Sequence, residues 1–366
     1  MTQDLSGVAN EAAASETFAQ NATAQESTAP AHGSVLTDLF DLDLGVDAQV
    51  LGATPEYTID DVAQRAGVSR ETVEKILLWF GQPSRNAAAK LYTQADVDAV
   101  GNVTWLTEAL HLTEKEISSV VIATGYASET YSRYLIERLV HQLMTSRNIG
   151  DTEARFEALR IAPKQTAKII DLVTYGFRRA FATTTHQLTT DCIARRGVGS
   201  EDQDAPFICA IGVCTIDEFS DRVASMGTWN YANQLRDFRS TAWNIINTHG
   251  GHLLRYNPDN LLYVSATTEL GARTALELCQ AGVSSPTGPV RVGLTWGYCT
   301  LMFADALGTD VTIAERLADA AAPSEALISP MAGRMLFKSP DFRLSPQQQR
   351  AVEGFDTLVP QHLAYA

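Results

Sequence analysis

The chain has 366 residues, of which 45% are hydrophobic and 19% are charged, so it is long enough for two globular domains with apolar cores. Its formal net charge is −15, and residues 1–64 contain eleven acidic and no basic side chains. This amino end lacks the basic start of a secretory signal and repels anionic surfaces, and no apolar run approaches the roughly 20 residues of a membrane span, so we expect a cytoplasmic protein without membrane contact.

The amino-terminal part contains two kinds of segment. Residues 1–34 are rich in Ala, Ser, Thr, Gln and Asn and poor in large apolar side chains, which predicts a disordered acidic tail. The following sequence, VLTDLFDLDLGVDAQVL, alternates Leu with Asp. This alternation fits either a short helix that docks an apolar face or a tethering arm.

Residues 35–196 are predicted to form a helical domain. Within it, residues 57–80 place apolar side chains at helical spacing on both sides of Gly67, and Ser69 is suited to cap a second helix. This pattern is typical of a helix-turn-helix motif, and a DNA-binding regulator is therefore one hypothesis. However, residues 65–150 contain nine basic and nine acidic side chains, and this balance does not favour binding to phosphates.

The sequence GVGSEDQDAP, residues 197–206, has the composition of a linker. After it, apolar strand-like runs alternate with helical patterns, so residues 207–366 are predicted to form a second domain that combines strands and helices. The five cysteines of the chain are odd in number and include no CxxC pair. We therefore expect buried free thiols rather than disulfides or a metal site.

Five segments in the second domain, spread over residues 206–340, resemble the catalytic domain of class III nucleotide cyclases, which include adenylate and guanylate cyclases. They are the strand and turn at 208–215 and the sequences GGHLLRYNPDNLLYV, VRVGLTWG, FADALGTDVTIAERL and APSEALIS. The resemblance implies an α+β fold of the ferredoxin-like type. Residues 57–195 resemble the helical regulatory domain that precedes this domain in some soluble actinobacterial adenylate cyclases.

The family resemblance implies a defined chemistry. In such enzymes the 3′-hydroxyl of ATP attacks the α-phosphorus, pyrophosphate leaves, and two Mg²⁺ or Mn²⁺ ions held by two Asp residues assist the reaction. The partner subunit supplies the residues that read the base and stabilise the transition state, so the site forms only in a head-to-tail homodimer. Mg²⁺ or Mn²⁺ is therefore expected here only if the site is functional.

The match to the two metal-binding positions of the family is incomplete. Where the family strand ends in a pattern like FADxxGFT, this chain reads ICAIGVCT, which places Ala210 at the first Asp. The second Asp matches Asp259 in the NPDN turn. The nearest acids after Ala210 are Asp217 and Glu218, which are expected at the start of the next helix.

Four further positions are carried over from the resemblance. Arg255 matches the base-reading Lys and Asp305 the other base-reading position, which makes both candidates for substrate binding. Thr312 stands at the transition-state Asn, and Arg316 matches the catalytic Arg. Arg is not equivalent to Lys, and Thr lacks the amide of Asn.

Other interpretations of these residues remain open. Asp259 is also an ordinary turn residue, Arg255 could form an interface salt bridge, and Arg316 could pair with Asp305 or Glu315. The favoured hypothesis is a degenerate cyclase-homology protein that acts as a regulatory or ligand-sensing homodimer for a nucleotide or small molecule, with little or no turnover of ATP. The alternative is an active adenylate cyclase, and the DNA-binding regulator is the third.

Overall fold

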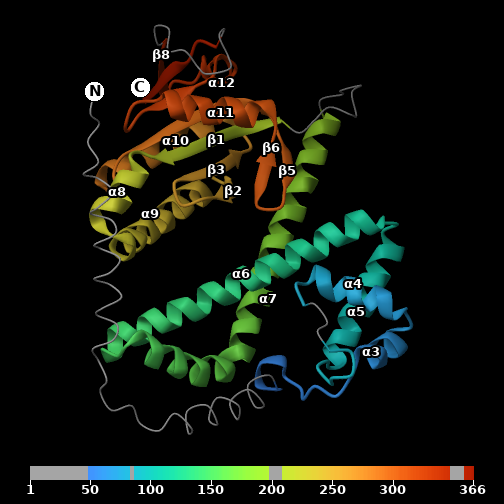
Figure 1. Cartoon of the computed structure of the whole chain (residues 1–366). Coiled ribbons are helices and arrows are strands. Elements are labelled where there is room, and N and C mark those ends of the chain that lie inside the picture. Colours follow the sequence, from blue (N-terminus) through green and yellow to red (C-terminus); the bar gives the residue numbers. More distant parts are fainter. Residues whose placement is uncertain (1–47, 83–85, 198–207, 347–357) are drawn as a thin grey trace, which may run out of the picture. The chain divides into compact units, whose positions relative to one another are not determined.

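The computed structural model describes residues 48–82, 86–197, 208–346 and 358–366 (Figure 1). The predicted tail, residues 1–34, and residues 198–206 of the predicted linker lie outside these ranges. The chain divides into two compact units, Met1–Ala194 and Arg195–Ala366, which are described separately.

The described part of the first unit consists of helices joined by connecting segments, with one isolated β-bridge between Tyr57 and Tyr92. Its helices are α3 (Ile59–Ala66), α4 (Arg70–Trp79), α5 (Gln94–Ala109), α6 (Glu114–Arg147) and α7 (Asp151–Gly197), the last of which ends just beyond the unit. The two helices of the predicted helix-turn-helix are α3 and α4. Gly67 ends α3 in the left-handed conformation, with φ of 71°, and the Ser69 side chain accepts a hydrogen bond from the Thr72 backbone N–H.

Apolar side chains at helical spacing hold this unit together. One cluster joins α3, α4, α5 and the start of α6, with fully buried Ile59, Val62, Val73 and Val100. A second, smaller cluster packs α6 against the start of α7. Among the described residues, no helix is both long enough and apolar enough to cross a membrane.

The second unit is built on a seven-stranded sheet with the strand order β2-β3-β1-β4-β7-β9-β8. Its strands are β1 (Ile208–Ile216), β2 (His252–Tyr256), β3 (Asn260–Ser265), β4 (Val290–Tyr298), β7 (Ala326–Ile328), β8 (Phe342–Pro346) and β9 (Gln361–Tyr365). Neighbouring strands are antiparallel except for β4 and β7. A separate two-stranded ribbon consists of β5 (Thr300–Met302) and β6 (Asp305–Leu307).

The helices of the second unit complete a known topology. They are α8 (Phe219–Met226), α9 (Thr228–Thr248), α10 (Thr268–Ser284), α11 (Thr309–Ala320) and α12 (Pro330–Leu336). The order β1, α8–α9, β2, β3, α10, β4 is a β-α-β-β-α-β unit, and its strands lie side by side as β2-β3-β1-β4, which is the ferredoxin-like arrangement. The predicted α+β fold class is therefore confirmed.

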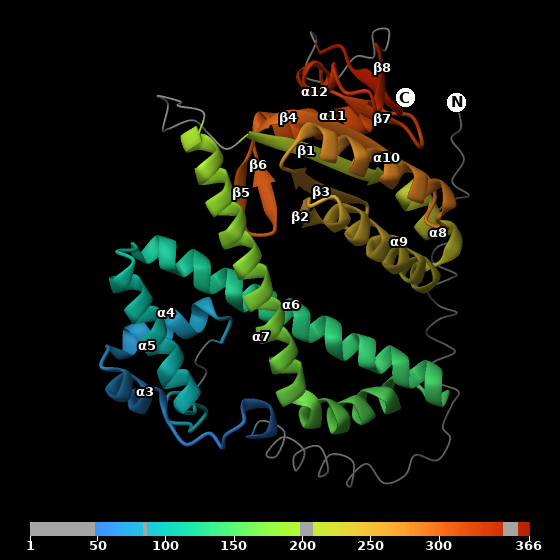
Figure 2. The ribbon, with the colours of Figure 1, turned by 180° about the vertical axis from the view of Figure 1, so that it is seen from behind.

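The central strand β1 is buried on both faces of the sheet. Ala210, Cys214 and Ile216 belong to a core cluster with side chains of α9, α10 and α12, whereas Cys209, Ile211 and Val213 pack against α11. Successive residues of a strand point to opposite faces, so β1 separates two layers of helices. The two opposite views of Figures 1 and 2 let the reader follow α11 on one face and α10 on the other.

The described cysteines confirm the expectation of buried free thiols. Cys209, Cys214, Cys279 and Cys299 are free and buried, while the side chain of Cys192 lies outside the described part of the chain. Burial raises the pKa of Cys279 to about 12 and raises that of Cys214 well above its usual value.

Candidate active site

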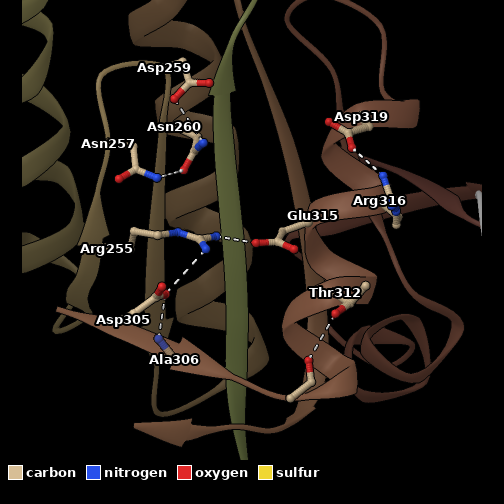
Figure 3. A network of polar contacts seen from close by, with 11 residues as sticks. Arg255, Asn257, Asp259, Asn260, Asp305, Ala306, Thr312, Glu315, Arg316 and Asp319 are labelled. Atoms are coloured by element: carbon tan, nitrogen blue, oxygen red, sulfur yellow. Dashed lines mark hydrogen bonds and ion pairs between the residues drawn. The ribbon is translucent and has the colours of Figure 1, made fainter. Parts of the chain in front are cut away.

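The turn between β2 and β3 carries the predicted metal-binding carboxylate, that of Asp259. The backbone N–H of Asn257 donates to the carbonyl of Asn260 at 2.9 Å, and this hydrogen bond closes the turn. Oδ1 of Asp259 accepts from Nδ2 of Asn260 at 3.2 Å (Figure 3). The Asp259 backbone carbonyl accepts from Ile216 N–H at 2.8 Å, so the turn is fixed beside the last residue of β1.

The register of the sheet places Ala210 away from Asp259. Ala210 pairs with Ser265 on β3, whereas Thr215 pairs with Asn260, the residue after Asp259. At about 3.3 Å per residue, Ala210 lies roughly 16 Å along β1 from Thr215. Ala210 is also 0% exposed, and its Cβ would lie 2.8 Å from a Cβ placed on Gly271 of α10. The β1 position beside Asp259 is therefore Thr215, and it carries a hydroxyl rather than a carboxylate.

Two acids after β1 have other partners. Asp217 pairs with Arg291 of β4, with 3.2 Å between Oδ1 and Nε, and its side chain is only 16% exposed. Glu218 occupies the N-cap position of α8, but its side chain makes no capping hydrogen bond and lies 3.5 Å from Arg222. Glu218 therefore lies at the start of the next helix, as expected, whereas Asp217 is held by an ion pair with the neighbouring strand β4.

Arg255 lies between two carboxylates. A β-bulge between Leu253 and Arg255 shifts the register of β2. The Arg255 guanidinium contacts Asp305 at 3.5 Å between Nη1 and Oδ1, and its Nη2 donates to Oε1 of Glu315 (Figure 3). The Arg255 side chain is 18% exposed, and those of Asp305 and Glu315 are each 37% exposed. Both acids that were considered as partners of Arg316 thus contact Arg255.

The ribbon and α11 supply the remaining candidates. Oδ1 of Asp305 also accepts from the Ala306 backbone N–H at 2.8 Å, which fixes the carboxylate at the start of β6. Thr312 Oγ1 donates to the Gly308 carbonyl at 3.4 Å, a contact within the first turn of α11. Arg316 lies one turn later, and its Nη1 is 3.5 Å from Oδ2 of Asp319 on the same helix.

The charges of this region do not fit a pair of divalent cations. Asp259 has an amide at Asn260 and a hydroxyl at Thr215 as its neighbours along the paired strands. Within the described ranges, no group of three or more His, Cys, Asp or Glu side chains is placed to hold a metal ion. Two adjacent doubly charged ions need several carboxylate ligands between them, so one carboxylate at the turn is too few.

Two residues of this region were missed from the sequence. Glu315 was considered only as a partner for Arg316, although its spacing of three from Thr312 places both on one face of α11. Thr215 was overlooked because ICAIGVCTI is apolar almost throughout, so the strand gives no alternation that would fix its register.

Comparisons with known proteins found similar sequences and similar solved structures. No protein-family model matches the chain. An adenylate cyclase of Glutamicibacter nicotianae is 26% identical over 329 residues, which are 87% of this chain and 81% of that protein. An adenylate cyclase of Streptomyces coelicolor is 23% identical over 346 residues, 87% of this chain and 88% of that protein. These similarities extend over both units.

The solved structures described next each cover less than half of this chain. An adenylyl cyclase of P. aeruginosa covers 43% of this chain and 93% of its own chain, at 17% identity and a TM-score of 0.38. A guanylate cyclase domain from Catenaria anguillulae in complex with GTP covers 43% and 96%, at 17% identity and a TM-score of 0.40.

Proposed function

We propose that this chain, which belongs to the class III nucleotide cyclase family, is a degenerate member that makes little or no cyclic AMP and acts as a regulatory or ligand-sensing protein. The observation that carries the proposal is the pairing of Thr215, rather than an acid, with the strand that follows Asp259. A site with one carboxylate at this point cannot offset the repulsion between two divalent ions.

The remaining site residues support the same proposal. Arg255 is engaged by Asp305 and Glu315, so its positive charge is already neutralised within the chain. The Thr312 hydroxyl points back to its own helix backbone, and Thr lacks the amide that the family uses to orient the reacting group. Removal of one preorganised donor typically lowers turnover by about 10²–10³-fold, and several such losses together leave little catalysis.

The proposed regulatory role includes self-association in a head-to-tail homodimer. The ribbon β5–β6 presents Leu301, Met302 and Phe303 with more than half of each side chain exposed. Large apolar side chains gathered at one exposed site are typical of a surface that is covered by a partner. In such a dimer, Arg255 and Asp305 of one protomer would face Asp259 of the other, and a nucleotide or small molecule would bind between them.

A turnover assay tests the catalytic part of the proposal. The full chain is incubated with ATP and either Mg²⁺ or Mn²⁺, and cyclic AMP is measured by mass spectrometry against a reaction without protein. We expect no product above this background. Metal-dependent turnover that is lost in the Asp259→Asn variant would contradict the proposal, because it would show that Asp259 supports catalysis.

An active adenylate cyclase is the second candidate, and one observation favours it. Both relatives described above are named adenylate cyclases, and each aligns with 87% of this chain. A weak enzyme that works with a single metal ion at Asp259 would keep this activity. The same turnover assay separates the active enzyme from the degenerate protein, since only an active adenylate cyclase predicts turnover that depends on Asp259.

The contacts of α4 argue against the DNA-binding hypothesis. Arg70 pairs with Glu74 at 2.9 Å and with Asp60 at 3.6 Å. Lys75 lies 3.5 Å from both Glu71 and Glu114. Both cations of the second helix are therefore balanced by acids of the same unit, and they offer little net charge to a phosphate backbone.

A further inference from the structure

Three separate elements bring one cation and two anions together in the second unit. Arg255 comes from the edge strand β2, Asp305 from the start of β6 and Glu315 from the middle of α11 (Figure 3). The three side chains carry a net charge of −1. A single carboxylate would suffice to neutralise the guanidinium, so the second one needs an explanation.

The guanidinium keeps donor capacity that the two acids do not use. An Arg side chain has five N–H donors in a planar fork. The Arg255 Nε atom is buried and has no hydrogen-bond partner among the described residues. The two carboxylates are each twice as exposed as the guanidinium, with 37% against 18% of the side chain accessible. A ligand can therefore reach the carboxylates from solvent and replace one of them at Arg255.

Asp305 and Glu315 are not equivalent in this arrangement. Besides its 3.5 Å ion pair with Arg255, Asp305 accepts a hydrogen bond from the Ala306 backbone N–H at 2.8 Å. For Glu315, the contact with Arg255 is the one hydrogen bond found for its side chain in the described structure. Glu also has one more rotatable bond than Asp, so Glu315 is the acid that can withdraw while α11 stays in place.

We propose that Glu315 is an intrachain competitor that occupies Arg255 and so weakens the binding of a nucleoside triphosphate at this site. This inference rests on the proposed function, because it assumes that a nucleotide site persists next to Arg255. The acceptor atoms of the nucleotide take the place of the Glu315 carboxylate, and Asp305 stays bound to the guanidinium. To bind, the nucleotide must break the hydrogen bond between Glu315 and Arg255. Its affinity is therefore lower, by the free energy of one charge-assisted hydrogen bond, than it would be at a free Arg255.

Calorimetric titration with ATP tests this role. The full-length Glu315→Gln variant keeps the size of the side chain and removes its charge. We expect it to bind ATP about tenfold more tightly than the wild type, which corresponds to the loss of one modest competing interaction. Adding Arg255→Ala to Glu315→Gln should abolish the gain. Inorganic triphosphate, titrated in parallel, separates recognition of the phosphates from recognition of the base.

Asp341→Asn is the matched control. Asp341 pairs with Arg273 of α10, so its replacement also removes one acid from an ion pair of the same unit. Asp341 pairs with α10, whereas Glu315 lies on α11, which packs on the opposite face of the sheet. The affinity of the Asp341→Asn variant for ATP should therefore equal that of the wild type. Equal affinities of Glu315→Gln and Asp341→Asn would overturn the inference, even if the wild type makes no cyclic AMP.

Failure to fold is also an informative outcome. If Glu315→Gln and Glu315→Ala both lose the cooperative thermal unfolding of the wild type, Glu315 is a structural partner of Arg255 and the inference is wrong. Cyclic AMP formation by the wild type would instead refute the proposed function, so the two failures can be told apart.

Discussion

At the residue scale, Ala210 and Thr215 offer opposite surroundings to an introduced carboxylate. Ala210 is 0% exposed and faces α10, so Ala210→Asp would bury an unpaired charge. We expect this variant to lose about 3–5 kcal/mol of unfolding free energy, or to fail to fold. Thr215 is half-buried next to the turn of Asp259, so Thr215→Asp should retain the wild-type stability to within about 1 kcal/mol.

The same pair of variants separates the two positions by function. Urea denaturation gives the stabilities, and titration with Mn²⁺ gives the metal affinity. A second carboxylate beside Asp259 should create Mn²⁺ binding in Thr215→Asp that is absent from the wild type. Equal stability of the two variants would show that the strand register assigned to β1 is wrong.

The candidate site could be predicted in part from sequence. Asp259 follows a GG and hairpin pattern whose turn chemistry is local, and its place in the turn could be found without a structure. Arg255 and Asp305 lie 50 positions apart, and their contact depends on the packing of the ribbon β5–β6 against β2. The β1 residue beside Asp259 could not be identified from sequence, because an apolar strand that is buried on both faces does not define its own register.

At the element scale, Gly293 sets how closely α11 approaches β4. A Cβ at this position would lie 2.0 Å from the Ala314 carbonyl oxygen and 2.4 Å from the Ala318 backbone nitrogen. Gly293→Ala should therefore push α11 away from the sheet and destabilise the protein by about 1–3 kcal/mol, measured by urea denaturation. Because α11 carries Glu315, we also expect the affinity for ATP to change.

Gly101 provides the control for this substitution. It lies inside α5, and a Cβ there would meet no heavy atom within 4 Å. Since Ala favours helices more than Gly does, Gly101→Ala should leave stability unchanged or raise it by up to about 1 kcal/mol. A loss of stability in Gly101→Ala as large as that in Gly293→Ala would contradict the close-approach argument.

Helices were more predictable than the order of strands. Capping boxes of Thr58 with Asp61 and of Thr113 with Glu116 lie at the starts of α3 and α6. Each box involves only four consecutive residues, so it can be recognised from local sequence. By contrast, β1 pairs with β3 and β4, and β7 with β9, through contacts between residues far apart in the chain. Such order follows from the complete fold and was predicted only through the family resemblance.

At the scale of the whole molecule, buried thiols and a buried phenol make the second unit sensitive to alkali. Burial raises the pKa of Cys279 from 9.0 to about 12 and raises the pKa values of Cys214 and Tyr263. The folded state therefore keeps protons that the unfolded chain releases. This contribution to stability is fully present below pH 9 and is lost as the pH rises toward 12.

Urea denaturation of the full chain at several pH values checks this expectation. The unfolding free energy should fall between pH 9 and pH 11. Cys279→Ala, which removes one of the three groups, should show a smaller fall than the wild type, although its stability at pH 7 is lower because of the lost side-chain volume. A wild-type stability that stays constant over this pH range would contradict the prediction.

The position of β1 in the chain has a consequence for synthesis on the ribosome. This strand is the first of its sheet to be made, but its two partners are complete only at Ser265 and Tyr298. At about 5–20 residues per second, the chain from Ile216 to Tyr298 takes roughly 4–16 s to appear. Until Ser265 is made, β1 has no hydrogen-bonded neighbour on either side, and until Tyr298 is made its edge toward β4 stays open to chaperones or to other nascent chains. Translation that halts before β4 should therefore yield aggregates rather than a folded half.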